Sequence, residues 1–75
     1  MDQIVELVKF IAESLVDNPD EIKITQEDDV IRLTASQSDM GKIIGKQGRI
    51  AKAFRCVVKS AAIKNNVRVT LDIVD

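Results

Sequence analysis

The residues with the clearest chemical potential in this 75-residue chain are two glycines, Gly45 and Gly48, separated by Lys46 and Gln47. A glycine accepts a left-handed backbone and lets another backbone approach closely, because it has no Cβ. Helical patterns lie on both sides, so the glycines predict a tight turn into the start of a second helix. A helix start carries partial positive charge and unpaired N–H donors, which suits a phosphate group.

Basic side chains surround this turn, with Lys42 before it, Lys46 inside it, and Arg49 and Lys52 after it. The chain has a formal net charge of −1, but the charges are divided along it. Residues 1–39 carry three basic and ten acidic side chains, whereas the remaining residues carry eight basic and two acidic ones. This division predicts one basic surface on an otherwise acidic protein, which is typical of nucleic-acid contact.

The amino-acid composition excludes several classes of function. The chain contains no His, Tyr or Trp, and its one cysteine is Cys56. Without His there is no proton shuttle at neutral pH and no imidazole to activate the thiol, so we expect no enzyme, no metal and no cofactor. A single cysteine, no signal-like start and no apolar run near 18 residues favour a cytoplasmic protein without a membrane span.

Hydrophobic periodicity predicts six elements around the turn. Apolar residues at three- and four-residue steps predict helices, and alternating apolar residues predict strands. In chain order we expect a helix over 3–17, strands over 22–25 and 30–35, a short helix to 44, a longer helix from 48 or 49, and a strand over 67–73. This α-β-β-α-α-β order predicts an α+β fold, with one three-stranded sheet and helices packed on one face.

Several polar residues are expected to mark the ends of these elements. Asp2 and Ser38 are suited to capping the first and second helices. Asn18-Pro19 should end the first helix, and Asn65-Asn66 the last. Glu27-Asp28-Asp29 is expected to form the turn of a hairpin.

The long helix is predicted to have one apolar and one basic side. Its apolar stripe should pack against the core and comprises Ile50, Ala53, Phe54, Val57, Val58 and Ala61. Lys52, Arg55 and Lys59 gather on the opposite side. We expect Phe54 to be a core residue and not a platform for base stacking. Cys56 lies off the stripe, so we expect an incidental thiol that is partly exposed or covered by a partner.

Residues 41–53, with the sequence Gly-Lys-Ile-Ile-Gly-Lys-Gln-Gly-Arg-Ile-Ala-Lys-Ala, resemble the signature of the KH domain. In its small size and in the sequence of residues 41–53, the chain is similar to the bacterial stand-alone KH proteins of the KhpA/YlqC family. The element order resembles the type II arrangement of that domain. The resemblance implies one KH domain over 1–75, with its core at about 30–75 and a helix-and-strand extension at about 1–26.

A KH domain clamps the backbone of about four nucleotides with its GXXG loop. The resemblance therefore implies that Gly45 and Gly48 shape the loop and that Lys46 and Gln47 project toward the phosphates of a single-stranded RNA. Ile43, Ile44 and Ile50 would pack the two helices around it. The expected RNA-binding residues are Lys42, Gly45, Lys46, Gln47, Gly48, Arg49 and Lys52. The facing strand would also contact bases, although the sequence does not single out a residue there.

The resemblance also implies partners. Proteins of this family pair with themselves or with a larger KH-containing protein of the Jag/KhpB type. The chain would then be a homodimer or a heterodimer in the cytoplasm, acting as a post-transcriptional regulator or RNA chaperone.

The glycines also allow other interpretations. A plain helix–turn–helix corner without a ligand remains open. A nucleotide-binding P-loop fits poorly, because Gly41 to Gly45 is one residue too short and Gln47 stands where Ser or Thr must hold magnesium. Gly41 and Gly45 have the spacing of a membrane dimer motif, but that motif needs an apolar segment of 20 residues, which this sequence lacks. The alternative function is a protein-interaction adaptor whose RNA contact is incidental, and weak dependence on salt would distinguish it.

Overall fold

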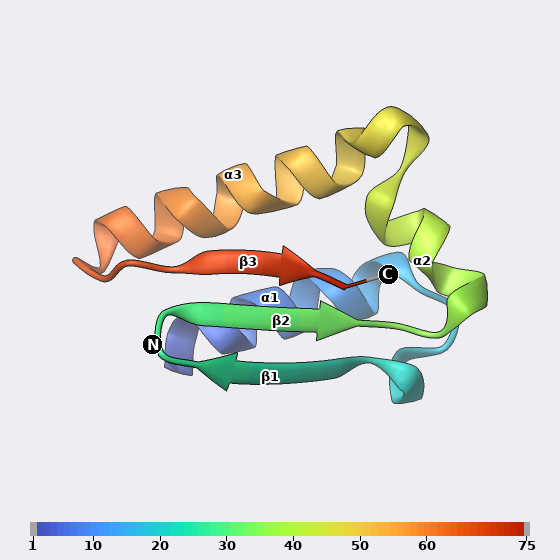
Figure 1. Ribbon diagram of the computed structural model, residues 1–75, viewed down its shortest axis with the longest axis horizontal. Coiled ribbons are helices and arrows are strands. Elements are labelled where there is room, and N and C mark those ends of the chain that lie inside the picture. Colours follow the sequence, from blue (N-terminus) through green and yellow to red (C-terminus); the bar gives the residue numbers. More distant parts are fainter. Residues whose placement is uncertain (1, 75) are drawn as a thin grey trace.

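The computed structural model describes residues 2–74 (Figure 1). It contains three α-helices, three strands and two short 3₁₀ turns, and this confirms the predicted α-β-β-α-α-β order. The elements are α1 (Asp2–Leu15), η1 (Pro19–Glu21), β1 (Lys23–Glu27), β2 (Val30–Thr34), α2 (Gln37–Ile44), η2 (Lys46–Gly48), α3 (Arg49–Lys64) and β3 (Thr70–Ile73). Within the described residues, no helix is both long and apolar enough to cross a membrane.

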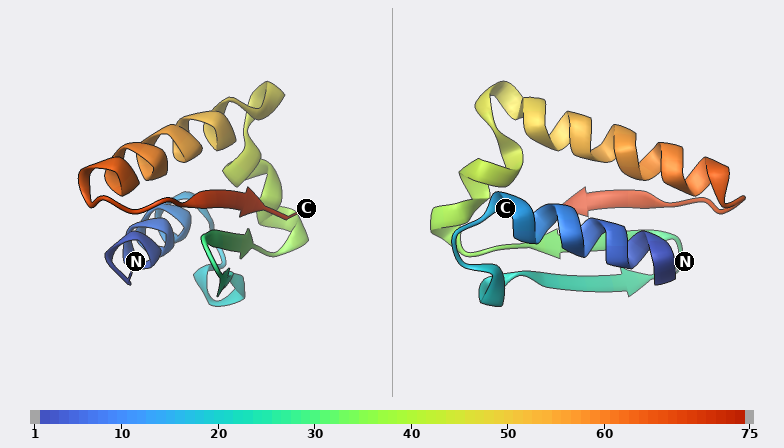
Figure 2. Two further views of the ribbon diagram at one scale, coloured as in Figure 1. Left: turned by 60° about the vertical axis from the view of Figure 1, so that its left-hand side comes forward. Right: turned by 180° about the vertical axis from the view of Figure 1, so that it is seen from behind.

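The three strands form one sheet in the order β1-β2-β3. β1 and β2 are an antiparallel hairpin joined by the predicted acidic turn, where Asp28 takes a positive φ of 55°. β2 and β3 are parallel, and such a pair needs a crossover connection, which α2 and α3 provide. Figure 2 shows α1 and α3 side by side on one face of this sheet, as the alternating strand pattern predicts.

The core lies between this sheet face and the helices. Ile31 and Leu33 of β2 have no exposed surface, and Leu71 of β3 pairs with Ile31 on the same side. The helices contribute Ile4, Val8, Ala12, Ile43, Phe54 and Val58 to this cluster. The predicted core position of Phe54 is thus confirmed, with 3% of the residue exposed.

Several predicted element ends differ from the structure. The first helix ends at Leu15 and not at residue 17, and β1 extends to Glu27, which was predicted to lie in the turn. The N-cap of α2 is Ser36, not Ser38, because the Ser36 carbonyl accepts the amides of Asp39 and Met40 at 2.9 and 3.1 Å. β3 begins three residues later than predicted, because the Val67 amide is bonded to the Ala62 carbonyl at the end of α3. The predicted capping role of Asp2 falls on a side chain outside the described part of the chain.

The apolar stripe predicted for α3 is only partly correct. The residues of α3 that the core buries are Ala51, Phe54, Val58 and Ala62. Ile50, Ala53 and Val57 are exposed instead, with 37% of Ile50 and 48% of Val57 open to solvent. The sheet covers one side of α3, and these three residues lie on the flank that turns toward α1.

Candidate nucleic-acid interface

The glycine loop, Gly45–Gly48, connects the end of α2 to the start of α3. Gly45 has φ 75° and ψ 176°, a combination open essentially to glycine alone. Gly48 takes the left-handed conformation with φ 73° and ψ 16°. Gln47 is also left-handed, with φ 57° and ψ 26°, which is unusual for a residue with a side chain. The predicted tight turn is therefore present, and its conformation depends on backbone regions that most residues avoid.

Gly45 also permits a close approach. A Cβ at this position would lie 2.6 Å from Cγ1 and 2.8 Å from Cβ of Ile50, whereas a Cβ on Gly48 would meet nothing within 4 Å. Ile50 therefore packs directly on the backbone of the loop. Ile43 is fully buried below it and Ile44 is partly buried, so the two helices are held together beneath the turn.

The side chains that the loop presents are exposed. These are Lys46 and Gln47 within the loop, with Arg49 and Lys52 in the first turn of α3. Within residues 2–74, the ion pairs involve only the cations of Arg32 and Lys42. Lys46, Arg49 and Lys52 thus have no carboxylate partner in the described structure, and their charges are available to an anion.

Lys42 is in a different environment from these three cations. Its Nζ pairs with the carboxylate of Asp17 and lies 3.4 Å from Oδ1 of Asp39. The hydrogen bond to Asp17 raises the pKa of Lys42 above its ordinary value, and it outweighs the effect of burial, which acts in the other direction. Lys42 was predicted to be a site residue, and it does lie beside the loop. Its charge, however, is paired with two carboxylates of the protein itself.

Asp39 is a buried carboxylate, with 1% of the residue exposed. It accepts hydrogen bonds from the Asn18 amide at 2.9 Å, the Asn18 side chain at 3.1 Å and the Ser36 hydroxyl at 3.1 Å, and a longer one from the Asp17 amide. Burial alone would raise the pKa of Asp39, but these hydrogen bonds, led by those from Asn18, lower it below its ordinary value. Asp39 therefore fastens the chain after α1 to the first turn of α2.

The amino-acid sequence alone does not predict this role for Asp39. The partners that define its actual function, Asp17 and Asn18, lie more than twenty positions earlier, and no local spacing signals their approach.

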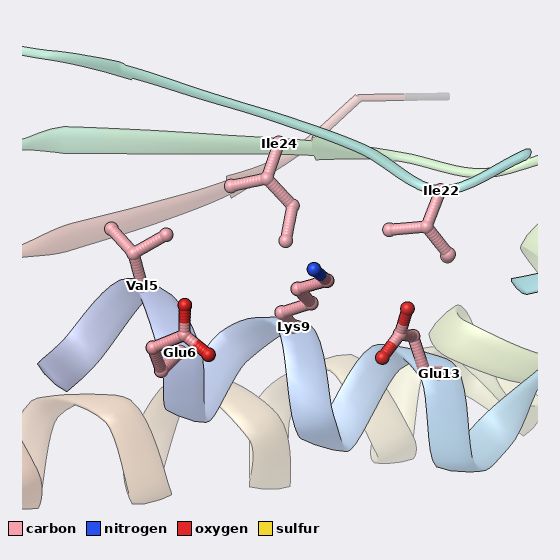
Figure 3. Close-up of a pocket in the computed structure, with 6 residues that line it drawn as sticks. All are labelled: Val5, Glu6, Lys9, Glu13, Ile22 and Ile24. Carbon is pink, nitrogen blue, oxygen red and sulfur yellow. The ribbon is translucent and has the colours of Figure 1, made fainter. Parts of the chain in front are cut away.

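Two of the hollows away from the loop bear on the choice of ligand. The first is about 320 Å³, lies between α1 and β1, and is lined by Val5, Glu6, Lys9, Glu13, Ile22 and Ile24 (Figure 3). Its two acids would repel a phosphate. The second is about 310 Å³ and lies between α3 and β3, lined by Arg55, Lys59, Val69, Thr70 and Leu71. There the Arg55 Nε donates to the Leu71 carbonyl at 3.4 Å, so a basic side chain is held over the facing strand.

Known proteins are similar to this sequence over nearly its whole length. The family model for the KH domain of KhpA/KhpB matches residues 5–73. The RNA-binding protein KhpA of Clostridium perfringens is 52% identical over 73 aligned positions, which cover 92% of this chain and 97% of that protein. The protein of the same name from Borreliella burgdorferi is 47% identical over 75 positions, covering 95% of this chain and 92% of its own.

A third protein named RNA-binding protein KhpA, from Halalkalibacterium halodurans, is 52% identical over 73 positions that cover 92% of this chain and 96% of the relative. No solved structure matches the chain at a significant level. The three helices and the mixed three-stranded sheet agree with a type II KH fold. This chain therefore belongs to the KhpA/KhpB family of KH domains.

Proposed function

We propose that this protein is a non-catalytic module that binds single-stranded RNA by clamping its phosphate backbone at the glycine loop. The observation that supports this most is the set of three exposed cations, Lys46, Arg49 and Lys52, that have no carboxylate partner in the described structure. The positive end of the α3 dipole lies at the same place and favours an anion, although the Gly48 and Arg49 amides already donate to the Gly45 and Lys46 carbonyls. The relatives named as RNA-binding proteins are consistent with this ligand.

In this proposal each loop residue has its own role in binding the RNA backbone. Gly45 and Gly48 allow the backbone to approach the phosphates, Lys46 and Arg49 supply charge, and Gln47 supplies a hydrogen-bonding amide. Lys52 extends the contact along α3. Lys42 contributes less than these, because its ion pairs with Asp17 and Asp39 must weaken before it can bind a phosphate.

Bases of the same RNA segment would lie against the hollow between α3 and β3. Arg55 is six residues after Arg49, about 9 Å along the helix axis, which is within the reach of a short oligonucleotide. Few side chains line this hollow, so the preference for base sequence should be loose. A single domain that grips about four nucleotides should also bind weakly. Pairing with a second KH domain, in another copy or in a larger KH-containing protein, would add avidity in the cytoplasm, where the module would act as a post-transcriptional regulator or RNA chaperone.

The decisive variant is Lys46→Asp with Gln47→Asp, measured by fluorescence anisotropy with a labelled single-stranded RNA. We expect binding to be lost while the circular dichroism spectrum and Tm stay close to those of the wild type. Lys23→Asp with Gln26→Asp is the matched control, because it makes the same change in charge at exposed positions on β1. The control should bind RNA with nearly normal affinity, and equal loss in both variants would contradict a localised clamp.

A protein-interaction adaptor is the second candidate, and the exposed apolar residues of α1 and α3 favour it. If the folded wild-type protein bound no RNA at low salt, the adaptor function would be favoured over RNA binding.

A further inference from the structure

A further hollow lies where α3 ends and the chain turns back into β3, beyond the hollow that contains Arg55. Its volume is about 240 Å³. Ile63 at the end of α3 forms part of its wall, although 67% of this residue is exposed. We call this space the far hollow and the space that contains Arg55 the near hollow. The far hollow is lined by Lys59, Ala62, Ile63, Val67, Arg68 and Val69.

The two hollows form one groove along α3. Lys59 and Val69 line both of them, so the two spaces adjoin. α3 and β3 run side by side in opposite directions, and the groove therefore follows α3 toward its end (Figure 1). Lys52 of the proposed clamp lies on the same side of α3, because it precedes Arg55 by three residues and Lys59 by seven. This side of α3 thus leads from the glycine loop to the far hollow.

The groove combines basic charge with an apolar floor. α3 carries five basic residues and no acid. Lys59 and Arg68 are exposed at the far hollow, and within residues 2–74 neither forms an ion pair with a carboxylate. Grooves that bind single-stranded nucleic acids hold the phosphates with cations and cover the bases with side chains. Because the groove is continuous with the glycine loop, this combination favours the RNA strand held there as its occupant.

An acidic turn closes the basic surface beyond the far hollow. The turn between β1 and β2 contains Asp28 and Asp29, and it lies beside the start of β3, because the Thr70 amide donates to the Asp29 carbonyl at 2.8 Å. Carboxylates repel a phosphate, so an RNA strand that follows the groove should end near Arg68.

We propose that the RNA strand continues from the near hollow into the far hollow, where Lys59 and Arg68 bind phosphates and Ile63 packs against a base. This inference rests on the proposed RNA clamp and lengthens its binding site. Ile63 is eight residues after Arg55, about 12 Å along the helix axis. Stacked nucleotides advance about 3.4 Å each and extended ones advance further, so this length accommodates about two or three nucleotides. They add to the roughly four that one KH domain clamps.

Fluorescence anisotropy with oligouridines of four and eight nucleotides tests the longer site. Arg68→Glu should weaken binding of the octanucleotide at least about five-fold, because repulsion replaces a phosphate contact, and binding of the tetranucleotide less than two-fold. Lys64→Glu is the matched control. It makes the same change in charge four residues earlier, at an exposed position that lines neither hollow, and should weaken octanucleotide binding less than two-fold.

The dependence on salt gives a second readout. Two additional phosphate contacts should make the wild-type slope for the octanucleotide more negative than that for the tetranucleotide by about 1.4. Arg68→Glu should remove at least about half of this difference.

Ile63→Ala tests the contact with a base. This variant should weaken octanucleotide binding about three-fold and leave tetranucleotide binding unchanged, because less apolar surface is covered. Phe10→Ala is the matched control, since 71% of Phe10 is exposed on α1, away from the groove, and it should bind both RNAs normally. Circular dichroism should show that all four variants are folded.

The two RNA lengths separate the longer site from the clamp. If Arg68→Glu and Ile63→Ala left octanucleotide affinity unchanged while the tetranucleotide still bound, the longer site would be wrong and the clamp would stand. Equal losses for both RNAs in Arg68→Glu would also overturn the longer site, because they would reflect the overall charge of the protein. If the wild type bound neither RNA at low salt, the clamp and its extension would both be wrong.

Discussion

The two ends of α2 are built in opposite ways. At its start, the buried carboxylate of Asp39 accepts hydrogen bonds from the chain after α1 and from Ser36. At its end, the loop from Gly45 to Gly48 has an unusual backbone, and Lys46 and Gln47 extend into solvent. A helix of eight residues is marginally stable by itself, so the Asp39 anchor and the buried side chains of Met40 and Ile43 together position α2 and the loop that follows it. The start of α2 contributes mainly to this positioning, and its end presents the exposed side chains.

The largest effect is expected at the exposed end, from Gly45→Ala. The new Cβ would require a backbone conformation available essentially to glycine and would collide with Ile50, so unfolding in urea should show a loss of about 3 kcal/mol. RNA affinity should fall with it, because the first turn of α3 must move.

Gly48→Ala is the matched control for this change. Gly48 is left-handed but has open space around it, so the same substitution should cost only about 1 kcal/mol. Equal losses at the two glycines would show that the contact with Ile50 does not shape the loop.

The next effect is expected at the fixed end, from Asp39→Asn. An amide at this site would turn a donor toward the donors of Asn18 and Ser36, so Tm at pH 7 should fall by on the order of 10 °C. Residual RNA binding by the folded fraction should be weaker too, because α2 loses its anchor. A variant with wild-type Tm would contradict the anchoring role.

The same residue predicts a dependence on pH. The pKa of Asp39 is lower in the folded protein than in the unfolded chain, so its stabilisation is complete above about pH 4 and is lost as the pH falls through the folded value. Thermal melts of the wild type and of Asp39→Asn should therefore converge as the solution is acidified below pH 4. A constant difference in Tm down to pH 2 would exclude this linkage.

The smallest expected effect is a difference in RNA affinity between substitutions of two lysines near the loop, Lys46 and Lys42. Lys46→Ala should weaken RNA binding by roughly five-fold, because one free charge is lost near a phosphate. Lys42→Ala should weaken it less than two-fold, but it should lower Tm because Asp17 and Asp39 lose their cation. Anisotropy titrations and thermal melts of both variants measure this contrast. A larger loss of RNA affinity in Lys42→Ala than in Lys46→Ala would show that Lys42 contacts the RNA despite its ion pairs.

The comparison of these two ends also shows what sequence can predict. The glycines, their positive φ values and the helical start at Arg49 follow from local residue types, and so do the alternating strands. The Asp39 anchor does not follow, because it depends on Asn18 approaching from across the fold. The pairing of Lys42 with Asp17 escaped prediction for the same reason.

The exposure of Ile50 and Val57 could not be predicted either. Helical periodicity identifies residues that share a side of α3, but it does not give the width of the surface that a small sheet and one neighbouring helix can cover. In this domain the apolar side of α3 is wider than the covered area, so Ile50 and Val57 stay exposed.

The most direct test of the central claim is the salt dependence of RNA binding by the wild-type protein. Three phosphate contacts from Lys46, Arg49 and Lys52 predict a slope of about −2 for the logarithm of the association constant against the logarithm of salt concentration. Affinity for a short single-stranded RNA should then fall about twenty-fold between 50 and 200 mM salt. A slope near zero would contradict a clamp built on these charges.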